Sequence, residues 1–302
     1  APSRGLGDVY KRQALACSAF VFLLGGGPVE MLCSFVGAGY GNFVRRKMID
    51  RHITLLACVA VSVAVACLLY LVPFMALQNF WGINERHEAG YIGAMLFIIP
   101  GFPFITSGLD LAKLDMRSGL ERAAYALLII TVATLVGWLV ALMVHLRPAN
   151  FAALPLNEWQ LLLMRLPASF CGVFGFSIMF NSTPKMAATA GVIGAIGNTL
   201  RLELVDFGMA AGPAAFLGAL ACGLLAAIVR NRVGYPRIAI TIPSVVIMVP
   251  GLYMYRAVYN LGLQSVNTGA EWLTRAMLIV LFLPLGQVAA RVLTDTKWRH
   301  NG

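Results

Sequence analysis

The sequence has few charged residues. Aspartate, glutamate, lysine and arginine make up only 12% of its 302 residues, whereas a soluble domain carries about 25%. Hydrophobic residues account for 59%, and the mean hydropathy is +0.79. Such a chain cannot cover the surface of a soluble globular protein, so the composition predicts an integral membrane protein.

Other absences narrow the function. The sequence has no Walker loop, which argues against ATP hydrolysis by this chain. Its six cysteines lie in or beside apolar segments without metal-ligand spacing, so we interpret them as small buried residues and expect no metal or cofactor. No obvious pair of acidic residues predicts an intramembrane hydrolase, so we do not expect an enzyme.

The basic residues carry information on orientation. The net charge is +10, but these residues fill short gaps between apolar runs, which favours a role at the bilayer surface over nucleic-acid binding. With ten spans and both termini in the cytoplasm, fourteen of them fall on the cytoplasmic side and four on the other. With nine or eleven spans, the basic residues would no longer be concentrated on one side of the membrane.

About ten apolar runs have the length of spanning helices, some of them short. They cover residues 14–27, 29–44, 53–77, 90–109, 123–145, 166–180, 186–200, 209–229, 238–261 and 272–292. Residues 1–13 lack an initiator Met and resemble a translated sequencing-adapter scar. We therefore expect this segment to be non-native and the true N-terminus to be missing.

Two runs each contain a Pro-Gly break, at Pro100-Gly101 and at Pro250-Gly251, 150 residues apart. Proline removes a backbone donor and clashes with the preceding helical turn. In lipid, a broken helix survives only where protein or a water-filled cavity satisfies its free backbone groups. Matching breaks in two halves of a chain point to the substrate site of a secondary transporter.

A second motif repeats in the same order. Gly41-Asn42 resembles Gly197-Asn198, and Pro28 and Pro184 each lie 13 residues before the glycine. The sequence thus predicts two five-helix modules, 14–146 and 166–292, joined by a linker at 147–165 and followed by a cytoplasmic tail at 293–302. Because five is odd, the second module enters the membrane from the opposite face, as an inverted repeat. Chance matches between short Gly/Pro motifs are the alternative.

The residues after the two breaks could form a binding site. Thr106, Ser107 and Asp110 follow the first break, and Tyr255 and Arg256 follow the second. A guanidinium can grip a substrate carboxylate through two hydrogen bonds, while an aspartate can meet an ammonium or relay a proton. The alternatives are that Asp110 is a solvated loop residue and that Arg256 extends its charge to the outer membrane surface.

Other polar residues have plainer interpretations. Glu30 lies in the turn at Pro28, where a solvated position is favoured over a coupling site. For Asn42 and Asn198 we favour helix capping or hydrogen bonds between helices over a place along the transport path.

At the broken spans the sequence resembles the threonine/serine exporters of the ThrE type. The matching stretches include 99–103, 118–122, 174–176, 249–251 and 255–256, and the resemblance covers about residues 20–290. It implies ten spans in two related modules of a bacterial inner-membrane protein, and export of L-threonine and L-serine driven by the membrane potential or proton gradient. It supplies no site residues. Many members carry a soluble N-terminal region that is missing here.

The sequence therefore predicts a secondary transporter that exports small neutral amino acids by the proton motive force. The predicted site comprises Pro100, Gly101, Thr106, Ser107, Asp110, Pro250, Gly251, Tyr255 and Arg256. Its expected partners are an amino-acid substrate and the lipid bilayer, and homo-oligomers stay open. Three alternatives also stay open: export of another small organic solute, a non-transporting membrane scaffold, and an intramembrane enzyme.

Overall fold

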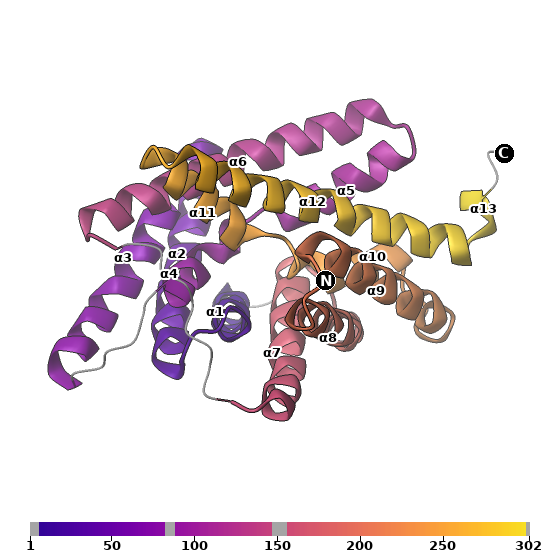
Figure 1. Ribbon diagram of the computed structural model, residues 1–302, viewed down its shortest axis with the longest axis horizontal. Coiled ribbons are helices and arrows are strands. Elements are labelled where there is room, and N and C mark those ends of the chain that lie inside the picture. Colours follow the sequence, from indigo (N-terminus) through magenta and orange to yellow (C-terminus); the bar gives the residue numbers. More distant parts are fainter. Residues whose placement is uncertain (1–5, 82–87, 147–155, 300–302) are drawn as a thin grey trace. The chain divides into compact units, whose positions relative to one another are not determined.

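A computed structural model describes residues 6–81, 88–146 and 156–299, and all regular structure in these ranges is helical (Figure 1). The first half contains α1 (Leu6–Leu23), α2 (Pro28–Asp50), α3 (Leu55–Trp81), α4 (Glu88–Met95), the 3₁₀ turn η1 (Leu96–Ile98), α5 (Gly101–Ala112) and α6 (Met116–Met143). The second half contains α7 (Glu158–Met179), α8 (Pro184–Asp206), α9 (Ala211–Val233), α10 (Arg237–Val246), α11 (Gly251–Gly262), α12 (Val266–Thr294) and α13 (Thr296–Arg299).

The helices confirm the all-α membrane class. Among the described helices, α3, α6, α7, α9 and α12 are each long and apolar enough to span a membrane, and there are up to seven spans if each bent pair counts as one. The three other predicted spans correspond to α1, α2 and α8, which fall short of the same criterion. Charged residues near the C-terminal ends of α2 and α8, such as Arg46 and Glu203, shorten their apolar length. The total of ten membrane spans therefore stays a prediction.

Both Pro-Gly motifs break their helices, as the sequence predicts. The segments Glu88–Ile98 and Gly101–Ala112 meet at 61°, and Arg237–Val246 and Gly251–Gly262 meet at 45°. Pro100 adopts a non-helical backbone with φ −81° and ψ 58° at the start of α5. Since proline also lacks an N–H donor, the helical hydrogen-bond ladder stops at this point.

The chain forms two compact units, and two of the five boundaries between them lie at the breaks. Unit 1 comprises Ala1–Ile99, Leu127–Asn157 and Gly251–Leu273. Unit 2 comprises Pro100–Ala126, Glu158–Pro250 and Thr274–Gly302. Consequently α11 belongs with α1 to α4, whereas α5 belongs with α7 to α10. The units do not coincide with the predicted modules, because each unit holds the second half of the other module's broken span.

The repeated Gly-Asn motif has the same packing role in each unit. A Cβ on Gly41 of α2 would lie 2.7 Å from the Cβ of Ala66 in α3, and a Cβ on Gly197 of α8 would lie 2.9 Å from the carbonyl oxygen of Gly218 in α9. Only glycine therefore permits these close approaches between helices.

The asparagines of this motif also act alike. Asn42 donates a hydrogen bond to the side chain of Gln13 in α1, and Asn198 donates one of 2.9 Å to Ser169 in α7. In both cases the acceptor lies 29 residues earlier in the chain. The interpretation of these asparagines as partners in hydrogen bonds between helices is confirmed.

Three segments differ from the predicted boundaries. Gln13, which the sequence analysis assigned to a non-native segment, is buried in α1 and bonded to Asn42, whereas residues 1–5 lie outside the described ranges. α7 begins at Glu158, inside the predicted linker, of which residues 147–155 also lie outside the described ranges. The predicted tail contains the end of α12 and the short helix α13.

Candidate functional site

A buried ion pair joins Arg256 of α11 to Glu88 of α4 in unit 1. The Nε of Arg256 lies 3.0 Å from Oε1 of Glu88, and its Nη2 lies 3.1 Å from Oε2. The two side chains are 9% and 3% exposed. The guanidinium thus donates two hydrogen bonds to one carboxylate, the strongest arrangement for such a pair. Arg256 is therefore buried and paired within unit 1, and its depth in the membrane stays a prediction.

One aromatic ring contacts this pair, and further aromatic side chains lie in the same unit. The guanidinium carbon of Arg256 lies 4.8 Å from the centre of the Trp272 ring, which is a cation–π contact. Tyr255 is buried and packs edge-on against Tyr91, with ring centres 6.1 Å apart. The Tyr91 hydroxyl donates to the carbonyl of Gly137 at 2.6 Å. Rings in place of water lower the local dielectric and strengthen the ionic contact.

A second carboxylate, Glu30 of α2, lies at the beginning of α4. Its oxygens accept hydrogen bonds from the backbone N–H of Gly90 at 3.0 Å and of Gly27 at 2.9 Å. Glu30 is only 4% exposed, so its interpretation as a solvated turn residue is wrong. The carboxylate satisfies free donors at the N-terminal ends of two helices, where negative charge is favoured.

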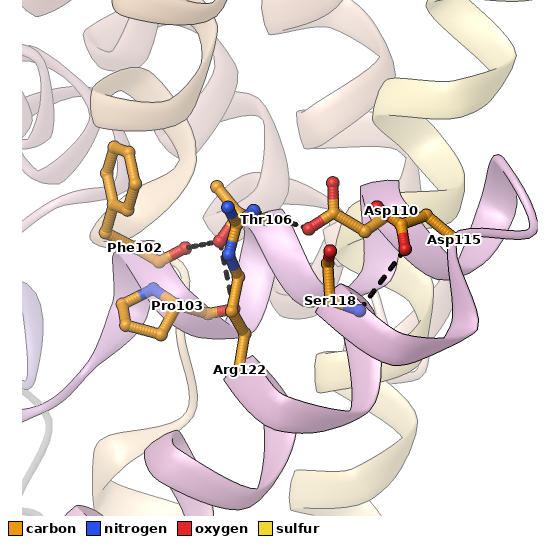
Figure 2. A network of polar contacts seen from close by, with 7 residues as sticks. All are labelled: Phe102, Pro103, Thr106, Asp110, Asp115, Ser118 and Arg122. Atoms are coloured by element: carbon orange, nitrogen blue, oxygen red, sulfur yellow. Dashed lines mark hydrogen bonds and ion pairs between the residues drawn. The ribbon is translucent and has the colours of Figure 1, made fainter.

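In unit 2, Asp110 of α5 forms an ion pair with Arg122 of α6 (Figure 2). The side chains are 23% and 50% exposed, so water screens this pair more than the buried pair of unit 1. Asp110 lies in the last turn of its helix, and its partner is a basic residue of the same predicted module.

Thr106 and Ser107 lie one turn earlier on α5 and are both 4% exposed. The Thr106 hydroxyl donates to the carbonyls of Phe102 at 3.0 Å and Pro103 at 3.2 Å (Figure 2). The hydroxyl hydrogen is therefore used in hydrogen bonds within α5. Thr106 can offer a ligand only an acceptor oxygen.

Asp115 caps the start of α6, just before Met116, and accepts a hydrogen bond from the Ser118 N–H at 3.3 Å (Figure 2). Hydrogen bonds from the side chain and backbone of Ser118 hold the pKa of Asp115 below its ordinary value. The cap is therefore complete at neutral pH and is lost as pH falls through that lowered pKa.

The structure brings each break into contact with the other broken span. A Cβ on Gly101 of α5 would lie 3.1 Å from Val246 of α10 in unit 2, and a Cβ on Gly251 of α11 would lie 3.1 Å from Leu96 of η1 in unit 1. Pro100 and Pro250 are buried at the same junctions. Within each unit, one half of a broken span therefore packs against one half of the other broken span.

The predicted charged residues belong to different units. Pro100, Gly101, Thr106, Ser107, Asp110 and Pro250 fall in unit 2, whereas Gly251, Tyr255 and Arg256 fall in unit 1. Asp110 and Arg256 each have an ionic partner within their own unit.

Sequence reasoning missed Glu88, the residue that neutralises Arg256. Glu88 directly precedes the apolar run that begins at Gly90, so it reads as the last residue of a loop. One signal was available, because a charge at membrane depth requires a counter-charge. An acidic residue beside the other broken span was the natural candidate.

Two family models together cover most of the chain. One, described as "Putative threonine/serine exporter", matches residues 12–145, and the other, described as "Threonine/Serine exporter, ThrE", matches residues 165–293. The chain belongs to the threonine/serine exporter family. It is accordingly a multi-pass membrane protein of an exporter family with both modules in one chain.

One curated relative is an uncharacterized protein of Haemophilus influenzae. It is 29% identical over 135 residues, which are 41% of this chain and 45% of the relative. The match thus spans less than half the length of that relative. No solved structure matches the chain significantly.

Proposed function

We propose that this chain exports L-threonine and L-serine across the bacterial inner membrane, driven by the proton motive force, with both termini in the cytoplasm. The family supports export of such solutes. The observation that carries the proposal is the buried Glu88–Arg256 pair beside a broken span. In this pair, Arg256 can receive a substrate carboxylate and Glu88 can accept a proton.

The proposed chemistry is an exchange of partners at Arg256. The guanidinium binds either the Glu88 carboxylate or the carboxylate of an amino acid, because both present the same two oxygens. A proton on Glu88 removes its negative charge and weakens its hold on Arg256. Export driven by inward proton flow requires the proton and the substrate to bind alternately. We therefore propose that the substrate inserts between Arg256 and the ionised Glu88, which holds its ammonium group, and that a proton taken up by Glu88 from the outer side releases the substrate.

The polar residues of α5 have proposed roles that are separate from that of Arg256. Asp110 is a second carboxylate that can receive the substrate ammonium or a proton, once Arg122 gives way. Thr106 and Ser107 line the same helix and offer hydroxyl oxygens. These roles can be tested apart from Arg256 because the two ion pairs share no residue.

Matched contacts support the inverted repeat. Gly119 packs against Leu111, and Gly269 packs against Leu261, so residues 150 positions apart make the same contact. The division into units passes through both broken spans at points that differ by one residue from exact equivalence. We propose that the two modules are related by a two-fold axis in the membrane plane, which five spans per module require.

Efflux from cells loaded with a threonine- or serine-containing dipeptide tests the function. We expect Arg256→Gln to lower threonine efflux at least tenfold, because a buried charge-assisted hydrogen-bonded pair is lost. In Glu88→Gln, we expect threonine efflux to continue but to be insensitive to a protonophore. Arg275→Gln, which alters an exposed arginine of α12, serves as the matched control and retains wild-type efflux.

Wild-type efflux and protonophore sensitivity in both Arg256→Gln and Glu88→Gln would contradict the mechanism. A panel of amino acids, organic acids and drugs identifies the substrate class. Efflux of another solute alone would replace the proposed substrates, and no efflux of any solute would favour a membrane scaffold.

A further inference from the structure

A pocket of about 340 Å³ lies in unit 2, apart from both ion pairs described above. It forms where α9 ends, α10 begins and α12 ends. Its lining consists of Arg230, Pro236, Arg237, Ile238, Arg291 and Asp295. The lining thus contains three arginines and one aspartate, so positive charge is in excess.

Arg237 is held rigidly in this pocket by neutral partners. Its Nη2 donates to the carbonyl of Gly223 at 3.0 Å, and its Nη1 donates to the Thr294 hydroxyl at 2.7 Å. Arg237 is 9% exposed. Within the described residues, the buried Nε atoms of Arg237 and Arg291 have no hydrogen-bond acceptor. Buried positive charge with unused donors is costly unless an anion is present.

The geometry of the pocket selects a phosphate group. α10 begins at Arg237, so its first backbone N–H groups and its dipole favour an anion at this end. Arginine forks match phosphate oxygens through paired hydrogen bonds. The pocket also lies at the ends of membrane-spanning segments, which is the level of lipid phosphates.

We propose that this pocket binds a phosphate group, supplied either by the head group of an anionic phospholipid or by free phosphate. Arg237 is the buried, hydrogen-bonded arginine of the site. Arg230 and Arg291 supply further hydrogen-bond donors to the phosphate. Because three helix ends line the pocket, a bound phosphate ties them together and raises the thermal stability of the protein.

Binding to the purified full chain in neutral detergent tests this site. The probes are short-chain phosphatidylglycerol, phosphatidylcholine of the same chain length, and inorganic phosphate, with affinity and melting temperature as readouts. We expect binding of phosphatidylglycerol or inorganic phosphate to weaken at least tenfold in Arg230→Gln/Arg291→Gln. The control Arg232→Gln/Arg117→Gln removes equal charge at exposed positions outside the pocket and retains binding.

The probes separate the two sources. Phosphatidylglycerol binding without phosphatidylcholine or phosphate binding identifies a lipid site, whereas inorganic phosphate binding identifies a free-phosphate site. No binding of either anion, or equal binding in the pocket and control variants, overturns the proposal. If the double variant fails to fold, the single variant Arg230→Gln, which alters an exposed side chain, decides the outcome by the same readouts.

Discussion

At the scale of single residues, the Glu88–Arg256 pair is the most consequential contact of unit 1. Both charges are removed from water, and two hydrogen bonds join them. Removal of one partner from such a buried pair costs about 3–5 kcal/mol, whereas replacement of both can be nearly neutral. Stability and function should therefore respond differently to single and double substitutions.

We predict that Arg256→Gln lowers the melting temperature of the purified protein, and that Glu88→Gln/Arg256→Gln restores most of that loss. Two amides can hydrogen-bond to each other without a buried charge. The double variant is nevertheless expected to lack threonine efflux, because the carboxylate receptor is gone. Thermal unfolding in detergent and dipeptide-loaded efflux measure the two effects. A double variant less stable than Arg256→Gln would contradict the pairing.

The sequence predicts one member of this pair and not the other. Arg256 stands out because it follows a helix break at membrane depth. Glu88 lies 168 residues away from it in the chain, and no local pattern records a contact over that distance. Glu30 was misread for a similar reason, since its partner Gly90 is 60 residues away.

At the scale of elements, the two broken spans are the best-predicted feature. Proline and glycine act on their own helix, so their effect can be read from a few residues. The start of α7 was less visible because Arg165 and Pro167 interrupt its hydrophobic pattern, and the helix nevertheless begins at Glu158. Tertiary packing decides such boundaries, and the sequence pattern does not contain it.

We predict that Pro100→Ala and Pro250→Ala each reduce efflux several-fold while the protein stays folded. Alanine restores a backbone donor and favours a continuous helix, which opposes the bends of 61° and 45°. Pro73→Ala is the matched control, because Pro73 lies within the unbroken helix α3. Efflux assays together with membrane expression levels test this. Equal efflux in all three variants would show that the breaks are dispensable.

At the scale of the whole molecule, the exchange of α5 and α11 between the units is the main departure from the predicted modules. Hydropathy and internal repeats divide the chain at its middle, and the family models match the same two halves. Compact packing divides it at both breaks and also within α6 and α12. Sequence periodicity indicates which segments are apolar. It does not indicate which helix of one half packs into the unit formed mostly by the other half.

We predict that the two halves, cut between residues 150 and 151 and co-expressed, assemble into a stable complex. Each half lacks a helix that its own unit requires, so association buries surfaces that neither half can bury alone. Co-purification through a tag on one half is the measurement. A second half that ends at Pro250 lacks α11, α12 and α13, and with them every helical segment that it contributes to unit 1, and should co-purify poorly. Equal recovery of both forms would contradict the role of the exchange.

The exchange also bears on how the protein is made. Glu88 is synthesised 168 residues before Arg256, so the ion pair between them forms only after most of the chain has been made. Unit 1 is complete only after Leu273, and unit 2 only at the end of the chain. A nonsense mutation anywhere before α11 therefore leaves both units unfinished.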